Sequence, residues 1–175
     1  MRWAFLCACL LLCGCYPGTT TYSPPQQFVM PNASDAPADA PLITMHDVTA
    51  PYSILEGVLD AGQGWGLKWT RKRSRFRFEV ADLTGADLVI RYAMDPATLH
   101  DRGPVQVAID INGKHFQTFT ESAPGEHEQR WPADALSSNV IRTLELTLTV
   151  DPPWTAPDGN QLGIFLDAIG FVPHR

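Results

Sequence analysis

The sequence VQVAIDINGKHFQTF, residues 105–119, carries the pattern of two strands and of the turn that joins them. Its first half has an apolar residue at every second position: Val105, Val107, Ile109 and Ile111. Asn112-Gly113 follows, and between two such runs this dipeptide is the strongest short signal for a two-residue hairpin loop. The stretch therefore predicts an antiparallel hairpin with one apolar face. The expected cross-strand pairs are Ile109 with Phe116, Val107 with Thr118 and, on the outer face, Asp110 with His115.

Three other stretches show the same period of two: RFRFEV (75–80), DLVIRYAM (87–94) and TLELTLTV (143–150). In the first and third, apolar residues alternate with charged or hydroxyl residues, and in the second Leu88, Ile90 and Tyr92 alternate with positions that include Asp87 and Arg91. Such alternation is typical of strands with one buried and one exposed face. The residues predicted to face inward are Phe76, Phe78, Val80, Leu88, Ile90, Tyr92, Leu144, Leu146, Leu148 and Val150. A helical pattern is expected only in one short turn, at 132–138.

The spacing of the strands indicates the fold class. They recur about every ten residues, and turns rich in Gly and Pro join them, which favours an antiparallel sandwich of about 120 residues. Three connections are long, at 95–104, 121–138 and 151–161. Long connections fit a jelly roll best. The predicted fold class is therefore all-β, an antiparallel jelly-roll β-sandwich.

Three segments together resemble the galactose-binding-like β-sandwich. They are GWGLKWTRKRSRFRF (64–78), the hairpin stretch 105–119 and APDGNQLGIFLDAIGFV (156–172). The resemblance spans about residues 60–172 in the right order, although Asn160 stands where that group often has arginine. It implies the same jelly-roll fold. Because the group includes sugar-binding modules and purely structural domains, it does not imply a particular ligand.

All four cysteines of the chain lie in CACLLLCGC, residues 7–15. The apolar spacer Leu10–Leu12 would give a metal ion no polar support, and cysteines two or four residues apart make strained or trivial disulfide loops. The segment begins with the charge of Arg2 and an apolar core, Trp3–Leu12. Such a core is typical of a signal peptide and is too short to span a membrane.

The end of this segment, Leu12-Cys13-Gly14-Cys15, resembles the lipobox of bacterial lipoproteins. The resemblance implies a signal peptide at 1–14, lipidation of Cys15 and acylation of the new amino terminus. Cys13 departs from the commoner alanine, serine or threonine but matches them in size. The implied location is the bacterial cell envelope, with the protein lipid-anchored to a membrane. The outer membrane is favoured, with the domain facing the periplasm or the surface; an ordinary cleaved signal peptide is the alternative.

Residues 15–51 are expected to form the lipidated cysteine and a disordered Pro-rich tether, and residues 52–175 the sandwich domain. Seven of the fifteen prolines fall within 16–51, among Thr, Ser, Ala and Asp. Such a composition buries too little apolar surface to order itself. As a coil the tether would span about 35 Å, and fully extended about 110 Å. Whether 42–48 already belongs to the domain is left open.

The charge of the chain excludes some classes of partner. Without residues 1–14 it has 12 basic and 19 acidic residues, a net charge near −7. This argues against general binding to nucleic acid or to an anionic membrane. A membrane contact is therefore expected through the lipid anchor alone.

The first candidate binding surface is a strand of arginines, Arg71, Arg73, Arg75 and Arg77, which share one side if the strand begins early. Guanidinium groups bind carboxylate or phosphate through two hydrogen bonds, so the strand could bind an anionic polymer or an acidic protein. The alternative is that Asp and Glu on neighbouring strands neutralise these charges.

Tryptophans provide the second candidate surface. Trp65 and Trp154 lie in predicted loops, where an exposed ring could stack on a sugar, and Trp69 shares a side with the arginines. The alternative is that these rings pack in the core. Trp131, directly before Pro132, is predicted to be structural.

No motif indicates catalysis or a bound cofactor. The sequence lacks the nucleophile, zinc and phosphate-loop motifs of common enzymes, so the protein is not expected to be an enzyme. His127 lies between Glu126 and Glu128 and could bind a metal ion with one of them, but it is expected to be solvated. Asp110–Gly113 also resembles a fragment of a calcium loop, which the hairpin explains fully. No cofactor or metal is predicted.

Two functions remain open. The first is a non-catalytic binding domain for envelope or extracellular carbohydrate, using Trp65, Trp69, Trp154 and the arginines. The second is a structural or assembly lipoprotein that docks a protein partner. Burial of the tryptophans would argue against the first, and an exposed edge strand or apolar patch would favour the second.

Overall fold

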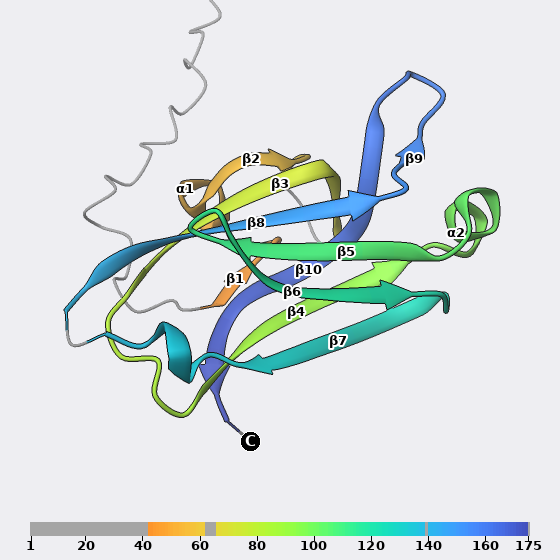
Figure 1. The fold of residues 1–175 in the computed structure, drawn as a ribbon. Helices are drawn as coiled ribbons and strands as arrows, with labels where there is room; N and C mark the ends of the chain where they lie inside the picture. Colours follow the sequence, from red (N-terminus) through yellow and green to blue (C-terminus); the bar gives the residue numbers. More distant parts are fainter. Residues whose placement is uncertain (1–41, 62–65, 139, 175) are drawn as a thin grey trace, which may run out of the picture. The chain divides into compact units, whose positions relative to one another are not determined.

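The strand β3 (Lys68–Val80) belongs to both sheets of the fold. Its first residues pair with β10 (Gln161–Pro173), whereas the residues from Arg73 onward pair with β8 (Arg142–Asp151). The computed structural model describes residues 42–61, 66–138 and 140–174, and every strand pair in it is antiparallel. The predicted all-β antiparallel sandwich is therefore confirmed (Figure 1).

The two sheets are built around β10 and β8. In the first sheet β10 pairs with β4, which pairs with β7, and two short strands also pair with β10. The bounds are β4 (Ala86–Met94), β7 (Gly125–Pro132), β1 (Leu42–Thr44) and β9 (Trp154–Thr155). In the second sheet β8 lies between β3 and β5, β6 flanks β5, and β2 pairs with β3. The bounds are β5 (Val105–Ile111), β6 (Lys114–Glu121) and β2 (Ile54–Val58).

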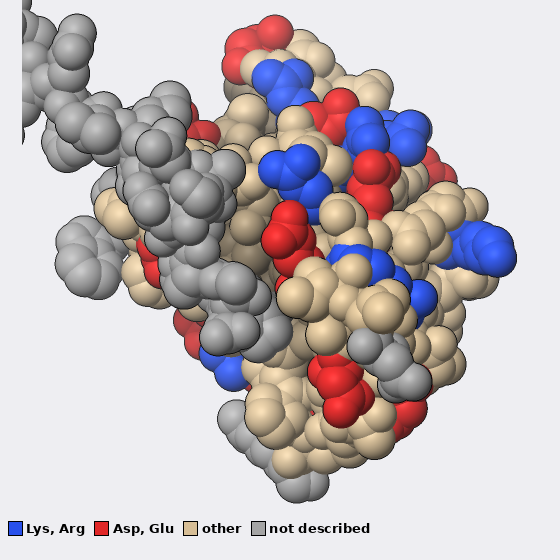
Figure 2. All heavy atoms as spheres, turned by 90° about the vertical axis from the view of Figure 1, so that its left-hand side faces the viewer, with Lys and Arg blue, Asp and Glu red and all other residues tan. Residues whose placement is uncertain are grey.

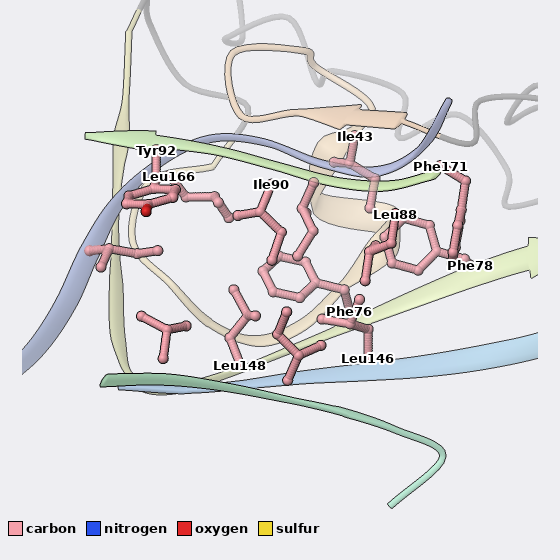
Figure 3. Close-up of a cluster of buried hydrophobic side chains, with 14 of the residues drawn as sticks. Ile43, Phe76, Phe78, Leu88, Ile90, Tyr92, Leu146, Leu148, Leu166 and Phe171 are labelled. Atoms are coloured by element: carbon pink, nitrogen blue, oxygen red, sulfur yellow. The ribbon is translucent and has the colours of Figure 1, made fainter. Parts of the chain in front are cut away.

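The core lies between the inner faces of the two sheets (Figure 3). Phe76 and Leu146 of the second sheet and Leu88 and Phe171 of the first are each at most 1% exposed. All the residues that the alternating pattern predicted to face inward are buried. Because burying one such side chain stabilises a fold by about 1.5–3 kcal/mol, this shared core is what holds the sheets together.

The hairpin of β5 and β6 forms at Asn112-Gly113, as predicted. Both turn residues have positive φ, 51° and 73°, which is the conformation that this turn requires. Asp110 pairs with His115 as expected, but a β-bulge then shifts the register, so that Ile109 pairs with Gln117 and Val107 with Phe119. The predicted pairs Ile109–Phe116 and Val107–Thr118 are therefore wrong.

The bulge has a packing reason. Phe116 and Phe119 both pack against the core, and residues three positions apart in a regular strand point to opposite faces. The extra residue of a bulge allows both to face inward. Phe119 then packs 5.5 Å from Trp131 and 5.6 Å from Tyr92 between ring centroids. The structural role predicted for Trp131 is confirmed.

The short helices have local causes. They are α1 (Ala50–Ser53), α2 (Pro96–Arg102) and the 3₁₀ helix η1 (Asp134–Leu136). The helical turn predicted at 132–138 corresponds to η1, whereas α2 was not predicted. Asp95 caps α2 by accepting a hydrogen bond from the Thr98 amide (2.9 Å), and Pro96 follows at the first helical position. None of the helices in the described part of the chain has the length and apolar character needed to span a membrane.

The folded region begins before the predicted boundary at residue 52. β1 pairs with β10 from Leu42–Gly170 to Thr44–Ala168, and the Met45 amide donates to the Asp167 carbonyl (2.7 Å). The sandwich therefore includes 42–48, the segment that the sequence left open. The predicted signal peptide and the rest of the tether lie outside the described residues.

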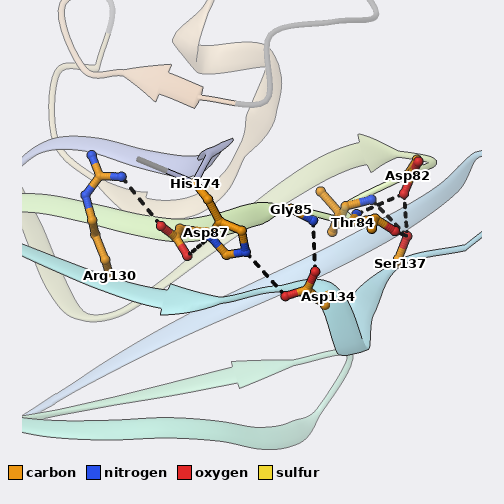
Figure 4. Close-up of polar contacts among 9 residues, drawn as sticks. Asp82, Thr84, Gly85, Asp87, Arg130, Asp134, Ser137 and His174 are labelled. Carbon is orange, nitrogen blue, oxygen red and sulfur yellow. Dashed lines mark hydrogen bonds and ion pairs between the residues drawn. The ribbon is translucent and has the colours of Figure 1, made fainter.

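The connections near the carboxyl terminus are tied together by polar contacts (Figure 4). Asp134 accepts a hydrogen bond from the Gly85 amide (2.8 Å), which joins η1 to the start of β4. His174 Nδ1 lies 2.7 Å from Asp87 Oδ1, and Arg130 Nη1 lies 3.7 Å from the other oxygen of Asp87. These contacts fix the end of β10 and hold Arg130 in place on β7.

Candidate functional site

A cleft of about 510 Å³ lies on the outer side of the first sheet. Its lining residues come from the segment before β3 and from β4, β7 and β10: Gly66, Leu67, Arg91, Tyr92, Glu126, His127, Glu128 and Asp167. Tyr92 is buried in the core, so the alternation of side chains along β4 turns Arg91 outward. Asp167 lies where the register of β10 with β4 shifts, between Leu166 and Ala168, and it lines the cleft beside Arg91.

Glu128 is a carboxylate of the cleft that accepts hydrogen bonds on both of its oxygens. It lies directly across from Arg91 in the pairing of β4 with β7. Arg130 Nε donates to one oxygen of Glu128 (2.6 Å) and Arg91 Nε to the other (2.7 Å). The hydrogen bonds from Arg130 and Arg91 lower the pKa of Glu128 to about 2. Glu128 is therefore ionised at any physiological pH.

Glu126 and Asp167 differ from Glu128. Glu126 is exposed and Asp167 is half-buried. Among the residues that the structure describes, neither side chain has a hydrogen bond or ion-pair partner. The cleft thus offers two carboxylates as hydrogen-bond acceptors.

A buried network fixes the loop that leads into β7. Glu121 is 8% exposed, and its Oε2 accepts a hydrogen bond from the Tyr92 hydroxyl (2.8 Å) and lies 3.2 Å from His127 Nδ1. Its other oxygen accepts from the amides of Ser122 (2.9 Å) and Ala123 (3.0 Å). Burial raises the pKa of Glu121, but the hydrogen bonds from the Ala123 amide and the Tyr92 hydroxyl outweigh it, so the pKa lies below its ordinary value.

His127 is also held in place by this network. Its ring stacks on that of Tyr92 with centroids 5.3 Å apart, and its Nε2 donates to the Ala123 carbonyl (3.0 Å). The expectation that His127 is solvated is therefore wrong. Because His127 is held from both sides, its neighbours Glu126 and Glu128 have fixed positions beside the cleft.

An aromatic group lies next to the cleft and consists of Trp69, Trp154 and Phe165. The rings of Trp69 and Phe165 are 3.7 Å apart between centroids, and those of Trp69 and Trp154 are 6.0 Å apart and nearly parallel, at 13°. All three residues are partly exposed. The indole nitrogen of Trp154 donates to Asp101 (3.4 Å), which orients the ring.

Strand register places this aromatic group in line with the cleft. Trp69 lies two residues after Leu67, and Phe165 lies two residues before Asp167. Trp69 and Phe165 are also direct partners in the pairing of β3 with β10. Because residues two apart on a strand lie on the same face, the aromatic group continues the surface of the cleft.

An interruption in β10 makes this arrangement possible. The register with β3 shifts between Leu162 and Phe165. The Thr70 hydroxyl, which is fully buried, donates to the Ile164 carbonyl (3.1 Å) and accepts from the Ile164 amide (2.9 Å). A Cβ on Gly163 would lie 2.4 Å from the Thr70 hydroxyl oxygen and 2.7 Å from the Arg71 carbonyl oxygen. The interruption therefore requires both Thr70 and Gly163.

The four arginines of β3 do not form one site with the tryptophans. Arg75 forms ion pairs with Glu145 (2.6 Å) and Glu56 (3.5 Å). This agrees with the alternative that acidic residues on neighbouring strands neutralise the arginines. Arg73 and Arg77 are exposed on the outer face of the second sheet. Arg71 lies two residues after Trp69. Its side chain donates a hydrogen bond to Asn160 Oδ1 (3.4 Å), and its backbone lies opposite Leu162 in the pairing of β3 with β10.

Of the other predicted site residues, Trp69 and Trp154 are brought together, whereas Trp65 and Cys15 lie outside the described residues. Sequence reasoning did not identify Arg91, Phe165 or Asp167 as site residues. Phe165 and Asp167 alternate with buried residues in the last strand, and that pattern could have marked them as outward-facing. Nowhere in the described segments do three or more His, Cys, Asp or Glu residues gather as they would around a metal ion.

Comparison with known proteins yields no match to a protein-family model and no match among curated sequences. Solved structures with a similar fold include the CBM36-1 domain of a multidomain xylanase from the hindgut metagenome of Trinervitermes trinervoides. Its TM-score is 0.43 at 11% identity, over 77% of this chain and 97% of that one.

A CBM36 carbohydrate-binding module in complex with calcium and xylotriose gives a TM-score of 0.33 at 18% identity, over 57% of this chain and 73% of that one. A 4-O-methyl-α-glucuronidase with specificity for decorated arabinogalactans gives 0.40 at 10% identity, over 69% of this chain but 16% of the enzyme. These ligands and substrates belong to those proteins, and at these TM-scores the sandwich of this chain rests on its own strand pairing.

Proposed function

We propose that the protein is a lipid-anchored lipoprotein of the bacterial envelope whose sandwich is a non-catalytic carbohydrate-binding domain. The observation that carries the binding proposal is the alignment of the cleft with the aromatic group. A sugar ring has apolar C–H faces that pack on aromatic rings and hydroxyl groups that need hydrogen-bond partners. Trp154, Trp69 and Phe165 supply rings, while Glu126, Asp167 and Arg91 supply acceptors and donors.

The dimensions of the cleft fit this ligand class. Its volume of about 510 Å³ lies within the range of about 300–1,000 Å³ that is usual for sites of small ligands. Binding sites of this kind combine apolar walls with a few fixed polar groups. Here the network of Tyr92, Glu121 and His127 fixes the polar residues of the cleft, and the strand pairing of β3 with β10 fixes the aromatic group that adjoins it.

The proposal is for binding and not for glycoside hydrolysis. Hydrolysis needs a carboxylic acid that is still protonated near neutral pH, and enzymes achieve this by raising its pKa. Glu128 has the opposite property, because two guanidinium groups hold its pKa at about 2. It serves as a fixed negative charge and as the partner that orients Arg91.

The binding proposal is tested with the full chain, purified in detergent micelles, on an array of neutral and acidic glycans. We expect binding to a subset of glycans that is weakened at least tenfold by Trp154→Ala. Arg73→Ala, which removes a guanidinium from the outer face of the second sheet, serves as the control and should bind as the unaltered chain does. Absence of binding to every glycan by a chain with an intact circular-dichroism spectrum would contradict the proposal.

The anchor is proposed on the lipobox resemblance, with Cys15 as the lipidated residue. Its test is metabolic labelling with a radioactive fatty acid, followed by fractionation of the envelope. Label and membrane association should both disappear in Cys15→Ala. Retention of the label by that variant would contradict the assignment.

A second candidate function, docking of a protein partner in an envelope complex, is favoured by one observation. Val140 and Ile141 are consecutive, lie directly before β8 and are 67% and 75% exposed. Contiguous exposed apolar surface is a feature of protein-interaction sites, and these two neighbouring side chains would contribute to such a surface. Chemical cross-linking in cells tests it: partner cross-links should be lost in Val140→Ser/Ile141→Ser, and an unchanged pattern would count against it.

A further inference from the structure

The charge of the cleft is strongly one-sided. Among the described residues that line it, three carry carboxylates, Glu126, Glu128 and Asp167, and one carries a guanidinium group, Arg91. Arg91 does not balance the other two acids, because its Nε is bound to Glu128 at 2.7 Å. Within the described part of the chain the carboxylates of Glu126 and Asp167 have no cationic partner, so they set the sign of the potential that a ligand meets there.

The groups around the cleft do not reverse this sign. Arg130 approaches from β7, but it is shared between Glu128 (2.6 Å) and Asp87 (3.7 Å). His127 Nδ1 lies 3.2 Å from a carboxylate oxygen of the buried Glu121. Arg130 and His127, which approach the cleft from β7, thus each face a carboxylate.

This arrangement distinguishes between saccharides. The hydroxyl groups of a neutral sugar can donate to the carboxylates of Glu126 and Asp167, and hydrogen bonds to charged acceptors are stronger than those between neutral groups. A uronic acid or a sulfated sugar would instead place a second negative charge within a few ångströms of them. Repulsion between like charges at such a distance, near a protein surface, lowers affinity by about tenfold or more.

We propose that Glu126 and Asp167 determine the specificity of the cleft, so that it binds uncharged saccharides and rejects those carrying carboxylate or sulfate groups. This inference rests on the proposed carbohydrate-binding function. It also reverses the expectation from the arginine strand, which pointed to an acidic polymer. Arg73 and Arg77 face outward from the second sheet, whereas the cleft is built on the first.

The test uses pairs of oligosaccharides with the same linkage and length that differ only at C6: glucose against glucuronate, galactose against galacturonate, and mannose against mannuronate. Binding to the full chain in detergent micelles is measured by titration calorimetry at low and at physiological salt. For any pair that binds, we expect the neutral member to bind at least about tenfold more tightly, with a smaller ratio at higher salt, because salt screens exposed charges.

Two variants test whether Glu126 and Asp167 cause this difference in affinity. Glu126→Gln and Asp167→Asn keep the size of each side chain and remove its charge, so each should reduce the ratio several-fold, mainly by improving binding of the acidic member. Glu79→Gln removes an exposed charge from the second-sheet part of β3 and is the matched control, expected to leave the ratio unchanged.

The results distinguish a failure of the specificity inference from a failure of the proposed carbohydrate binding. Equal affinity for both members of a pair, or a ratio that Glu126→Gln and Asp167→Asn leave unchanged, would overturn the specificity inference and leave carbohydrate binding standing. A folded chain that binds no saccharide at all would overturn the proposed function itself and this inference with it.

Discussion

The outer faces of the two sheets are made from the same alternating pattern but differ in how their polar groups are paired. On the second sheet Arg75 lies between Glu56 and Glu145, and Lys72 lies 3.7 Å from Asp151. On the first sheet Glu126 and Asp167 have no partner in the described part of the chain, and the aromatic group adjoins them. Paired charges stabilise a surface, whereas unpaired acceptors beside exposed rings can bind a ligand.

The charged side chains on one face of the molecule are mixed in sign. On the face drawn in Figure 2, Lys and Arg side chains are interspersed with Asp and Glu side chains, and neither sign gathers into one large area. Sequence alone draws attention to the arginine strand, because its charges are close together along the chain. The folded protein instead supplies counter-charges from other strands.

The largest effect is expected from the interruption in β10 that supports the first-sheet face. Gly163→Ala places a methyl group 2.4 Å from the Thr70 hydroxyl and 2.7 Å from a backbone oxygen that cannot move freely. We expect a loss of about 3 kcal/mol in the free energy of unfolding, as for severe overpacking. Urea denaturation measures it, and a loss below about 1 kcal/mol would show that β10 accommodates the methyl group.

The next effect concerns the hydroxyl that fills the interruption. Thr70→Val keeps the shape but leaves the buried Ile164 amide and carbonyl without this partner, which should lower the free energy of unfolding by about 2 kcal/mol. Thr149→Val, on β8 of the second sheet, is the matched control and should change it by less than about 0.5 kcal/mol. Equal effects at the two positions would show that the Thr70 hydroxyl has no special role.

Two substitutions by alanine, one on each sheet, test which outer face binds the oligosaccharide. Trp69→Ala removes the ring that contacts both Trp154 and Phe165, so oligosaccharide affinity should fall at least tenfold. Arg77→Ala on the second sheet should change it by less than twofold. Titration calorimetry measures both, and the reverse order of effects would move the site to the arginine strand.

The smallest effect is the pH dependence contributed by Glu128. Hydrogen bonds from Arg130 and Arg91 lower its pKa from 4.5 to about 2 in the folded protein. Ionised Glu128 therefore stabilises the fold above about pH 4.5, and this contribution disappears as the pH falls towards 2. Because about a third of the side chain is exposed, the contribution is below about 1 kcal/mol. Urea denaturation of the unaltered chain and of Glu128→Gln should differ at pH 6 and converge near pH 2.

Local patterns determined the parts of the fold that sequence could predict. Alternation fixed which residues of β3, β4, β5 and β8 face the core, and Asn112-Gly113 fixed the position of the hairpin turn. The bulge at Phe116 was missed because it depends on packing of Phe119 against Tyr92 and Trp131, which lie on other strands. α2 was missed because its seven residues are too few to show a helical period in the sequence.

The site was harder to predict than the fold because it depends on contacts between distant residues. Thr70 and Ile164 are 94 positions apart, and their hydrogen bonds bring Trp69 and Phe165 together. Trp69 and Trp154 were predicted separately, without any indication that they stack. Glu126 and Glu128 were noticed only as neighbours of His127, since nothing local shows that Arg91 pairs with one and not with the other.

The most direct test of the central claim, that the outer face of the first sheet is the binding surface, is mapping of backbone amide NMR shifts during titration with a neutral oligosaccharide that binds. The account predicts that the perturbed amides cluster at Leu67, Trp69, Trp154 and Asp167 and along 126–128, while those of 73–77 stay unchanged. Perturbations concentrated at 73–77, with the cleft unaffected at saturation, would contradict it.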